Sequence, residues 1–201
     1  MKIKMLLFTM LLGGHAAFSQ SIYDFGKGDI FLKGSFPYVN SFHLQFWRFS
    51  KNNSGFAGMA GGWSYHFNQK YFLEGSTGVM GDLSVPIGAT DRAEGEYENM
   101  FSAFTRITFN HTNGVFSFGY GLNGSLNGWA RRWEGEAPPS FLEDDEIQTG
   151  VGPVITGYYY LGPFYAGLQY HAQFAGGGDV YYSHIISLDF GLHLRIRKKS
   201  R

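Results

Sequence analysis

The chain has 201 residues, and its 16 basic and 16 acidic side chains leave no formal net charge. Balanced charge creates no long-range field that would attract an anionic polymer, which argues against nucleic-acid binding. Charged residues make up only 16% of the sequence, whereas an ordinary soluble domain has roughly 25%. Much of the surface is therefore expected to face something other than water.

The first 19 residues have the pattern of a secretory signal peptide. Lys2 and Lys4 precede an apolar run from Met5 to Leu12, and Ala17-Phe18-Ser19 offers a cleavage site before Gln20. The apolar run is too short for a membrane-spanning helix, and no later segment has about 20 continuous apolar residues. The sequence thus predicts a signal peptide at 1–19, and an exported domain at 20–201 without a membrane helix. With no cysteine, we expect neither disulfides nor a thiolate metal site.

Beyond residue 20, apolar residues alternate with polar or small ones, as in half-buried β-strands. The alternation predicts eight strands, most of them longer than average. They are expected near residues 41–50, 55–67, 71–83, 97–110, 115–127, 147–160, 163–176 and 181–197.

The start of the first strand is open. Residues 29–36 also alternate, and counting them separately gives nine strands, whereas single-chain bacterial barrels have even numbers. Either the first strand covers about 29–50 with a break near Pro37, or one of the two pieces lies outside the sheet.

The connections alternate between short and long. Three are tight, at 68–70, 111–114 and 161–163, whereas 84–96 and 128–146 are long and polar. Outer-membrane barrels have short periplasmic turns and longer outward loops. We therefore expect the tight turns and the C-terminus on the periplasmic side.

The small face of each strand indicates which side is inside. Between Phe116, Phe118 and Tyr120 stand Ser117 and Gly119, which suit a narrow interior better than the charged exterior of a soluble barrel. In the last strand the same reasoning turns the bulky apolar residues outward, toward lipid. Aromatic residues also gather near the tight turns, at 65–72, 109–116 and 158–165, and such girdles are typical of membrane interfaces.

These features resemble the small eight-stranded outer-membrane barrels of Gram-negative bacteria, of the OmpX or OmpA-transmembrane type in Bacteroidetes. The resemblance rests on architecture and glycine-rich strands from residue 20 onward. A weaker resemblance links the order of elements to the conjugative-transposon protein TraO: Val85-Pro86-Ile87, then Ala93-Glu94-Gly95 before a strand, and a glycine-rich strand ending near Trp129. The resemblance implies an all-β closed antiparallel barrel in the bacterial outer membrane, with lipid and lipopolysaccharide as partners and an envelope protein as a further partner, in conjugation or secretion. The last strand departs from the usual pattern, because it continues into basic residues rather than ending on an aromatic one.

An eight-stranded barrel is just wide enough for side chains to fill it, so we expect a filled lumen rather than an open channel. Buried charges require partners, and inward positions include a set of polar side chains that is expected to form a charge-paired cluster. This lumen polar cluster comprises His66, Glu74, Glu98, Arg106, His171, Asp189, His193 and Arg195. His43 and the histidines of the cluster are interpreted as hydrogen-bonded lumen donors.

The long loop at 128–146 is the candidate working surface. Trp129 and Trp133 flank Arg131 and Arg132, and Trp and Arg are the residues most often found at binding hot spots. The alternative is that they only anchor the loop at the membrane interface.

Other functions have weaker support. The pattern Gly119-x-Gly121-x-x-Gly124 lies within a strand, whereas a dinucleotide site needs it between a strand and a helix. The histidines lack metal-site spacing, so we expect no metal or cofactor. An outer-membrane hydrolase remains an alternative, with Asp179, His184 and the acidic residues 143–146 at loop level. A soluble lipocalin-like carrier is a second alternative.

Overall fold

The computed structural model describes residues 25–82, 95–134, 142, 144–176 and 180–197. All elements in this part of the chain are strands. It therefore contains no helix that is long and apolar enough to cross a bilayer. The strands are β1 (Ile30–Gln45), β2 (Ser50–Gly55), β3 (Gly58–His66), β4 (Tyr71–Gly81), β5 (Gly95–Asn113), β6 (Phe116–Glu134), β7 (Asp144–Leu161), β8 (Phe164–Ala175) and β9 (Tyr181–Arg197). The predicted signal peptide at 1–19 lies outside the described residues.

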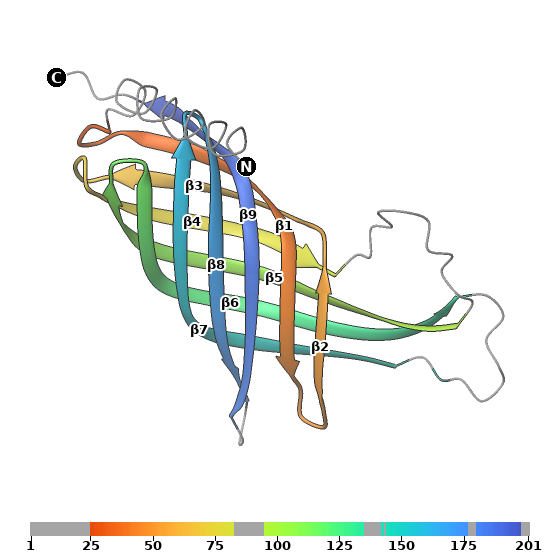
Figure 1. Ribbon diagram of the computed structural model, residues 1–201. Helices are drawn as coiled ribbons and strands as arrows, with labels where there is room; N and C mark the ends of the chain where they lie inside the picture. Colours follow the sequence, from red (N-terminus) through yellow and green to blue (C-terminus); the bar gives the residue numbers. More distant parts are fainter. Residues whose placement is uncertain (1–24, 83–94, 135–141, 143, 177–179, 198–201) are drawn as a thin grey trace, which may run out of the picture.

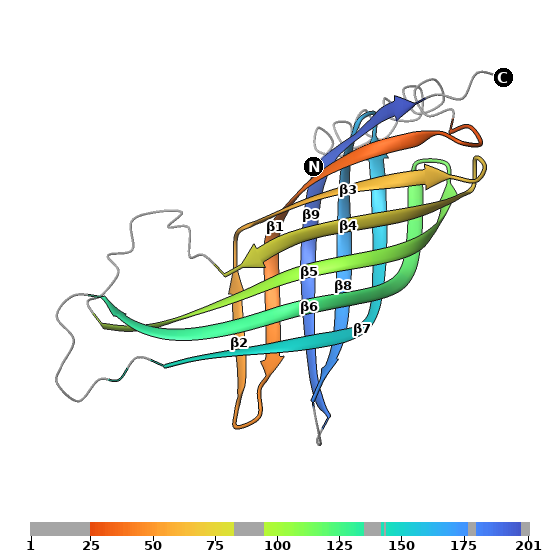
Figure 2. The same ribbon diagram turned by 180° about the vertical axis from the view of Figure 1, so that it is seen from behind.

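The strands form a closed antiparallel barrel. Neighbours in sequence pair from β3 to β9, and β9 pairs back onto β1, with Gly34 opposite Leu192 and Phe42 opposite Ile185. The final strand therefore seals the barrel against the first (Figures 1 and 2).

β2 and β3 are two halves of one strand. Both pair with β1 in a single register, in which Ser50 lies opposite Gln45 and Tyr65 opposite Ile30. The interruption at residues 56–57 faces a register shift in β1 between Pro37 and Val39. The barrel thus has eight strands, as predicted, and β1 continues through an irregularity at Pro37. This is the first of the two alternatives that the sequence left open, although β1 ends at Gln45 rather than near residue 50.

The bulky face of the barrel is outside. Phe118 and Leu168 are 54% and 52% exposed, whereas their neighbours Ser117 and Gln169 are buried. This is the predicted orientation, and it contradicts the soluble-carrier alternative, because a carrier would turn its apolar face inward. Apolar side chains cover the outside, and the lumen holds both polar and apolar side chains.

The connections distinguish two rims. The turns at 67–70, 114–115 and 162–163 are short and lie together with the start of β1 and the end of β9 (Figure 1). Gly114 and Gly162 have φ near +60°, a conformation that favours glycine in tight turns. We call this end the inner rim and the opposite end the outer rim. By the rule for outer-membrane barrels, the inner rim faces the periplasm.

The girdle at the inner rim is smaller than predicted. Tyr65, Tyr71 and Phe116 are exposed on the outside. Phe72 and the tyrosines at 158, 160 and 165 are buried in the lumen instead. Their places follow from strand parity, because every second residue of a strand points inward.

Near the outer rim the barrel divides into two sheets. β5, β6 and β7 continue in one direction, while β8, β9, β1 and β2 run in another (Figure 2). β4 stops at Gly81, opposite Phe101 of β5, and the pairing of β7 with β8 ends at Val151. The predicted loop at 128–146 is therefore largely wrong, because β6 extends to Glu134 and β7 begins at Asp144.

Candidate functional site

The lumen is filled by three layers of side chains. Near the inner rim lies an aromatic layer, in which the ring of His66 stacks between Phe25 at 4.4 Å and Phe72 at 4.7 Å. The ring of His193 stacks on Phe31 at 4.3 Å. Phe25 belongs to the segment before β1, and this segment is fixed at the rim because Gly28 donates a backbone hydrogen bond to the carbonyl of His66.

The middle layer is built around two buried cations and a shared carboxylate. Lys33 Nζ donates to both carboxylate oxygens of Glu74, at 2.9 and 3.0 Å. Arg106 donates to the same carboxylate at 3.4 Å and to Tyr158 Oη at 3.0 Å. The Lys33 ammonium also lies 3.5 Å from the centre of the Tyr158 ring, a cation–π contact.

A second carboxylate completes the middle layer. Asp189 accepts hydrogen bonds from Ser35, Gln169 and Tyr165, the last at 3.3 Å. Gln169 also accepts from Arg106 and so joins the two halves of the network. Two cations and two carboxylates are thus held in one hydrogen-bonded set, which satisfies the requirement that buried charges be paired.

The outer layer is apolar. It closes the space between the two diverging sheets with buried side chains from β1, β4, β5, β6 and β9 and from the turn after β1. Its members are Phe42, Leu44, Phe46, Met80, Met100, Phe104, Trp129 and Ile185. A path along the barrel axis would have to cross this layer, the charged layer and the aromatic layer.

Most of the predicted lumen polar cluster lies in these layers. Glu74, Arg106 and Asp189 lie in the middle layer, where His171 Nε2 is 3.1 Å from the Gln169 side-chain oxygen. His66 and His193 belong to the aromatic layer instead. Neither ring nitrogen of His66 has a hydrogen-bond partner among the described residues, and its ring is held by the stacking contacts.

Two members of the predicted cluster lie at its ends. Glu98 is close to the outer rim and forms an ion pair with Lys51. Arg195 lies near the inner rim, where its Nε is 3.5 Å from a carboxylate oxygen of Asp29. A single cluster of all eight residues is therefore not formed. Sequence reasoning missed Lys33, whose inward position depends on the register of β1.

The predicted loop contacts lie in β6 rather than in a loop. Trp129 is only 4% exposed and belongs to the apolar layer, so it is not a surface contact. Arg131 and Arg132 donate to main-chain carbonyls of Leu142 and Asp144, at 3.2 and 3.3 Å. They link β6 to the connection that follows it. Trp133 is half-buried in the same strand.

The proposed hydrolase residues are not assembled in the described part of the chain. Asp179 and residue 143 lie outside the described residues. His184 is on the outer face of the barrel, where its ring stacks on His43 at 5.0 Å, so His43 is not a lumen residue either. Among the described residues, no group of three or more His, Asp or Glu side chains could hold a metal ion.

Part of a second aromatic girdle lies on the outside of β1, β8 and β9, closer to the outer rim. His43, Tyr170, Tyr182 and His184 pack beside one another on the outside, and the two tyrosine hydroxyls are hydrogen-bonded to each other. His184 is ten residues before Leu194 of the same strand, and a tilted membrane strand needs about 9–11 residues. The part of β9 between His184 and the inner rim is therefore long enough to cross the hydrocarbon of a bilayer.

The largest exposures of apolar side chains occur beyond this second girdle. Trp47, Leu142 and Val180 are 75%, 75% and 77% exposed. Each lies in a connection at the outer rim: between β1 and β2, between β6 and β7, and before β9. We call these three residues the outer-rim tips. No alternating pattern marks them in the sequence, because they lie in connections rather than in strands.

Comparison with known proteins identifies the fold. No protein-family model matches the chain, and no curated protein matches it. Among solved structures, Ail, the attachment invasion locus protein of Yersinia pestis, has a TM-score of 0.55 at 12% identity, over 84% of this chain and 99% of Ail. Neisserial surface protein A has a TM-score of 0.47 at 12% identity, over 83% of this chain and 97% of its own. OprG of Pseudomonas aeruginosa has a TM-score of 0.39 at 13% identity, over 86% of this chain and 98% of OprG.

The chain folds as an eight-stranded outer-membrane β-barrel. The closed sheet, the two girdles and the apolar exterior between them match the requirements for spanning a bilayer with strands. The protein is therefore located in the bacterial outer membrane, and its exterior contacts membrane lipid.

Proposed function

We propose that this protein is a closed, non-enzymatic barrel that binds a protein partner through the outer-rim tips. The observation that carries the proposal is the position of Trp47, Leu142 and Val180, which are the most exposed large apolar side chains described and lie in connections at the outer rim. Exposed apolar groups cost free energy in water, and tryptophan is among the residue types most enriched at binding hot spots.

The filled lumen supports a binding role over a transport role. Each of the three layers blocks the axis, both cations of the charged layer pair with Glu74, and Asp189 accepts a hydrogen bond from Gln169. We expect no stepwise conductance from the purified barrel in planar bilayers. Reproducible single-channel steps would contradict a closed lumen.

A photo-crosslinking residue at position 47 tests the binding surface in living cells. We expect a discrete protein adduct, because Trp47 would be desolvated in the complex. The combined variant Leu142→Ser/Val180→Ser should remove the adduct, and Arg48→Ser should keep it, since Arg48 is an exposed neighbour outside the apolar set. A crosslinker at Leu122, on the lipid-facing side, is expected to give no protein adduct.

The same experiment separates this proposal from its alternatives. The absence of any protein adduct at position 47 would overturn it. An adduct with a conjugation or secretion component would identify the envelope assembly to which the resemblance to TraO points. The hydrolase alternative has no supporting geometry, because His184 lies on the exterior among His43, Tyr170 and Tyr182.

A further inference from the structure

A groove follows strand β4 on the outside of the barrel. Its floor is formed by the outward residues of the outer part of β4, Gly75, Thr77, Val79 and Gly81, of which Thr77 and Val79 are the largest. Larger residues stand on both sides: Met59 and Trp63 on β3, and Phe101 on β5. β4 therefore leaves a channel between two ridges of side chains.

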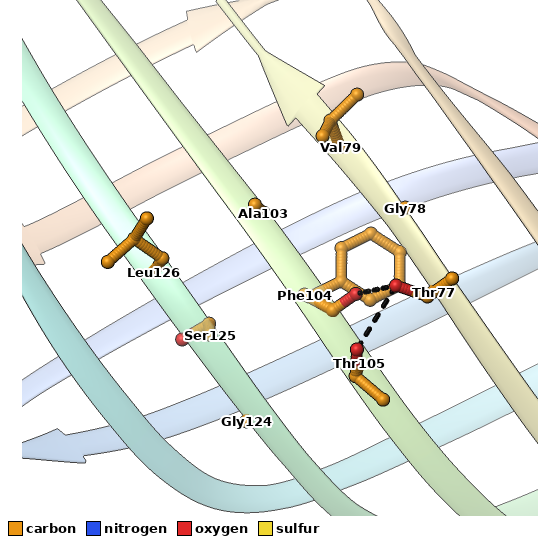
Figure 3. Close-up of a pocket in the computed structure, with 9 residues that line it drawn as sticks. All are labelled: Thr77, Gly78, Val79, Ala103, Phe104, Thr105, Gly124, Ser125 and Leu126. Carbon is orange, nitrogen blue, oxygen red and sulfur yellow. Dashed lines mark hydrogen bonds between the residues drawn. The ribbon is translucent and has the colours of Figure 1, made fainter.

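Three hollows make up this groove. One of about 260 Å³ lies beside Trp63, Thr77 and Thr105, and one of about 400 Å³ shares Thr77 and Thr105 with it. The third, of about 640 Å³, shares Val79 with the second and continues to the end of β4. Figure 3 shows the middle hollow, in which Ala103 lies between Val79 and Leu126, and Gly124 lies beside Thr105.

The groove is apolar where it is widest. Met59, Val79 and Phe101 are the exposed apolar side chains that line the third hollow, and the methionine side chain adapts readily to a flexible partner. A volume of about 640 Å³ is within the range of sites that hold small ligands. The hydroxyls of Thr77 and Thr105 on the floor need no ligand. Thr77 Oγ1 donates to the carbonyl of Phe104 at 2.9 Å, and Thr105 Oγ1 lies 3.1 Å from Thr77 Oγ1.

We propose that this groove holds an acyl chain of a lipopolysaccharide molecule from the outer leaflet. The groove is continuous with the lipid-facing surface, since Met59, Val79 and Phe101 belong to both. It opens at the outer end of β4, near Asn99, which is ten residues before Phe109 of the inner girdle. Ten residues of strand cross the hydrocarbon, so the mouth lies at the level of the outer headgroups.

A cation beside the mouth suits the phosphorylated headgroup of this lipid, because the carboxylate of Asp82, which also borders the third hollow, is buried and hydrogen-bonded to Asn53. Arg132 is on the outward side of β6, paired in register with Tyr97 of β5, two residues beyond Asn99. Arginine is well suited to bind phosphate through paired hydrogen bonds. A phospholipid from the inner leaflet would have its headgroup at the opposite end of the groove.

Native mass spectrometry of the refolded full chain tests the proposal. The protein is mixed with equal amounts of lipid A and phosphatidylethanolamine and released from mild detergent. We expect one lipid A to be retained in preference to the phospholipid. Gly124→Leu should reduce this retention at least tenfold, because an added side chain at Gly124 meets no atom within 4 Å and would enter the middle hollow.

Gly157→Leu is the matched control. Gly157 also points outward with no atom within 4 Å of an added Cβ, but it lies on β7, away from the groove. It should retain lipid A like the unaltered chain. Ala103→Leu provides a second groove-filling variant, and heat-modifiable gel migration checks that each barrel is folded.

Equal retention in the groove and control variants would overturn the proposal. So would equal retention of phosphatidylethanolamine, or no retained lipid at all. Neither result bears on the protein-binding role of the outer-rim tips, which is read from adducts at position 47. The two proposals can therefore fail separately.

Discussion

The buried pair of Lys33 and Glu74 offers the sharpest test of how the lumen is stabilised. Glu74→Gln removes a carboxylate that lies 2.9 Å from Lys33 and 3.4 Å from Arg106. Two cations then share only the carboxylate of Asp189. Removing one partner of a buried pair costs about 3–5 kcal/mol, so we expect Glu74→Gln to lower the free energy of unfolding by that amount.

A double-mutant cycle isolates the pair itself. Lys33→Met keeps an apolar stem beside Tyr158 and removes the charge. In the double variant Lys33→Met/Glu74→Gln, one cation and one carboxylate remain, and we expect its destabilisation to be about 2–3 kcal/mol smaller than the sum of the single effects. Reversible urea unfolding in lipid vesicles, followed by tryptophan fluorescence, measures all four proteins. Additivity within about 0.5 kcal/mol would refute the coupling.

Three further variants test other parts of the barrel by the same unfolding assay. Burial raises the pKa of Asp82, just beyond the end of β4, so the charged form of this side chain is disfavoured in the folded protein. The unaltered chain should therefore lose stability relative to Asp82→Asn as the pH rises from about 4 to about 7. A flat difference across this range would contradict that reasoning. Gly191→Ala should be strongly destabilising, because its Cβ would lie 2.1 Å from the carbonyl oxygen of Gly34, and a neutral effect would show that β1 and β9 can separate locally. Leu122→Arg, on the lipid-facing side, should cost about 2–4 kcal/mol in a bilayer, and no cost would argue against membrane burial at this position.

The late strands were predictable because their alternation is unbroken. In β9 each outward apolar residue from Ile186 to Ile196 is followed by a small or polar one. The period of two then fixes the face of every side chain, which is why the inward positions of Asp189 and His193 could be inferred.

The first strand was less predictable, since its parity changes. Lys33 and Ser35 point inward before the register shift at Pro37, whereas Asn40 and Phe42 point inward after it. A bulge adds a residue to one strand without any change in composition. The sequence pattern therefore left the start of the barrel open and did not reveal Lys33 as the partner of Glu74.

The long strands β6 and β7 were underestimated for a different reason. Residues 128–134 contain glycine, arginine and glutamate and read as loop, yet they continue β6 by pairing with β5. Trp129 is buried there because the sheets diverge and their inner faces pack on each other. Such a contact depends on which strands face one another across the lumen, which local sequence does not encode.

The charges of the middle layer come from opposite ends of the chain. β1, β4 and β5 contribute Lys33, Glu74 and Arg106, and these three side chains together have one excess positive charge. The compensating carboxylate, Asp189, is added only with the last strand. A barrel whose seam is still open thus carries an uncompensated cation in its interior until β9 docks on β1. The charges of the middle layer sum to zero only when the barrel is closed. Electrostatics therefore favours the complete barrel over an intermediate that lacks its final strand.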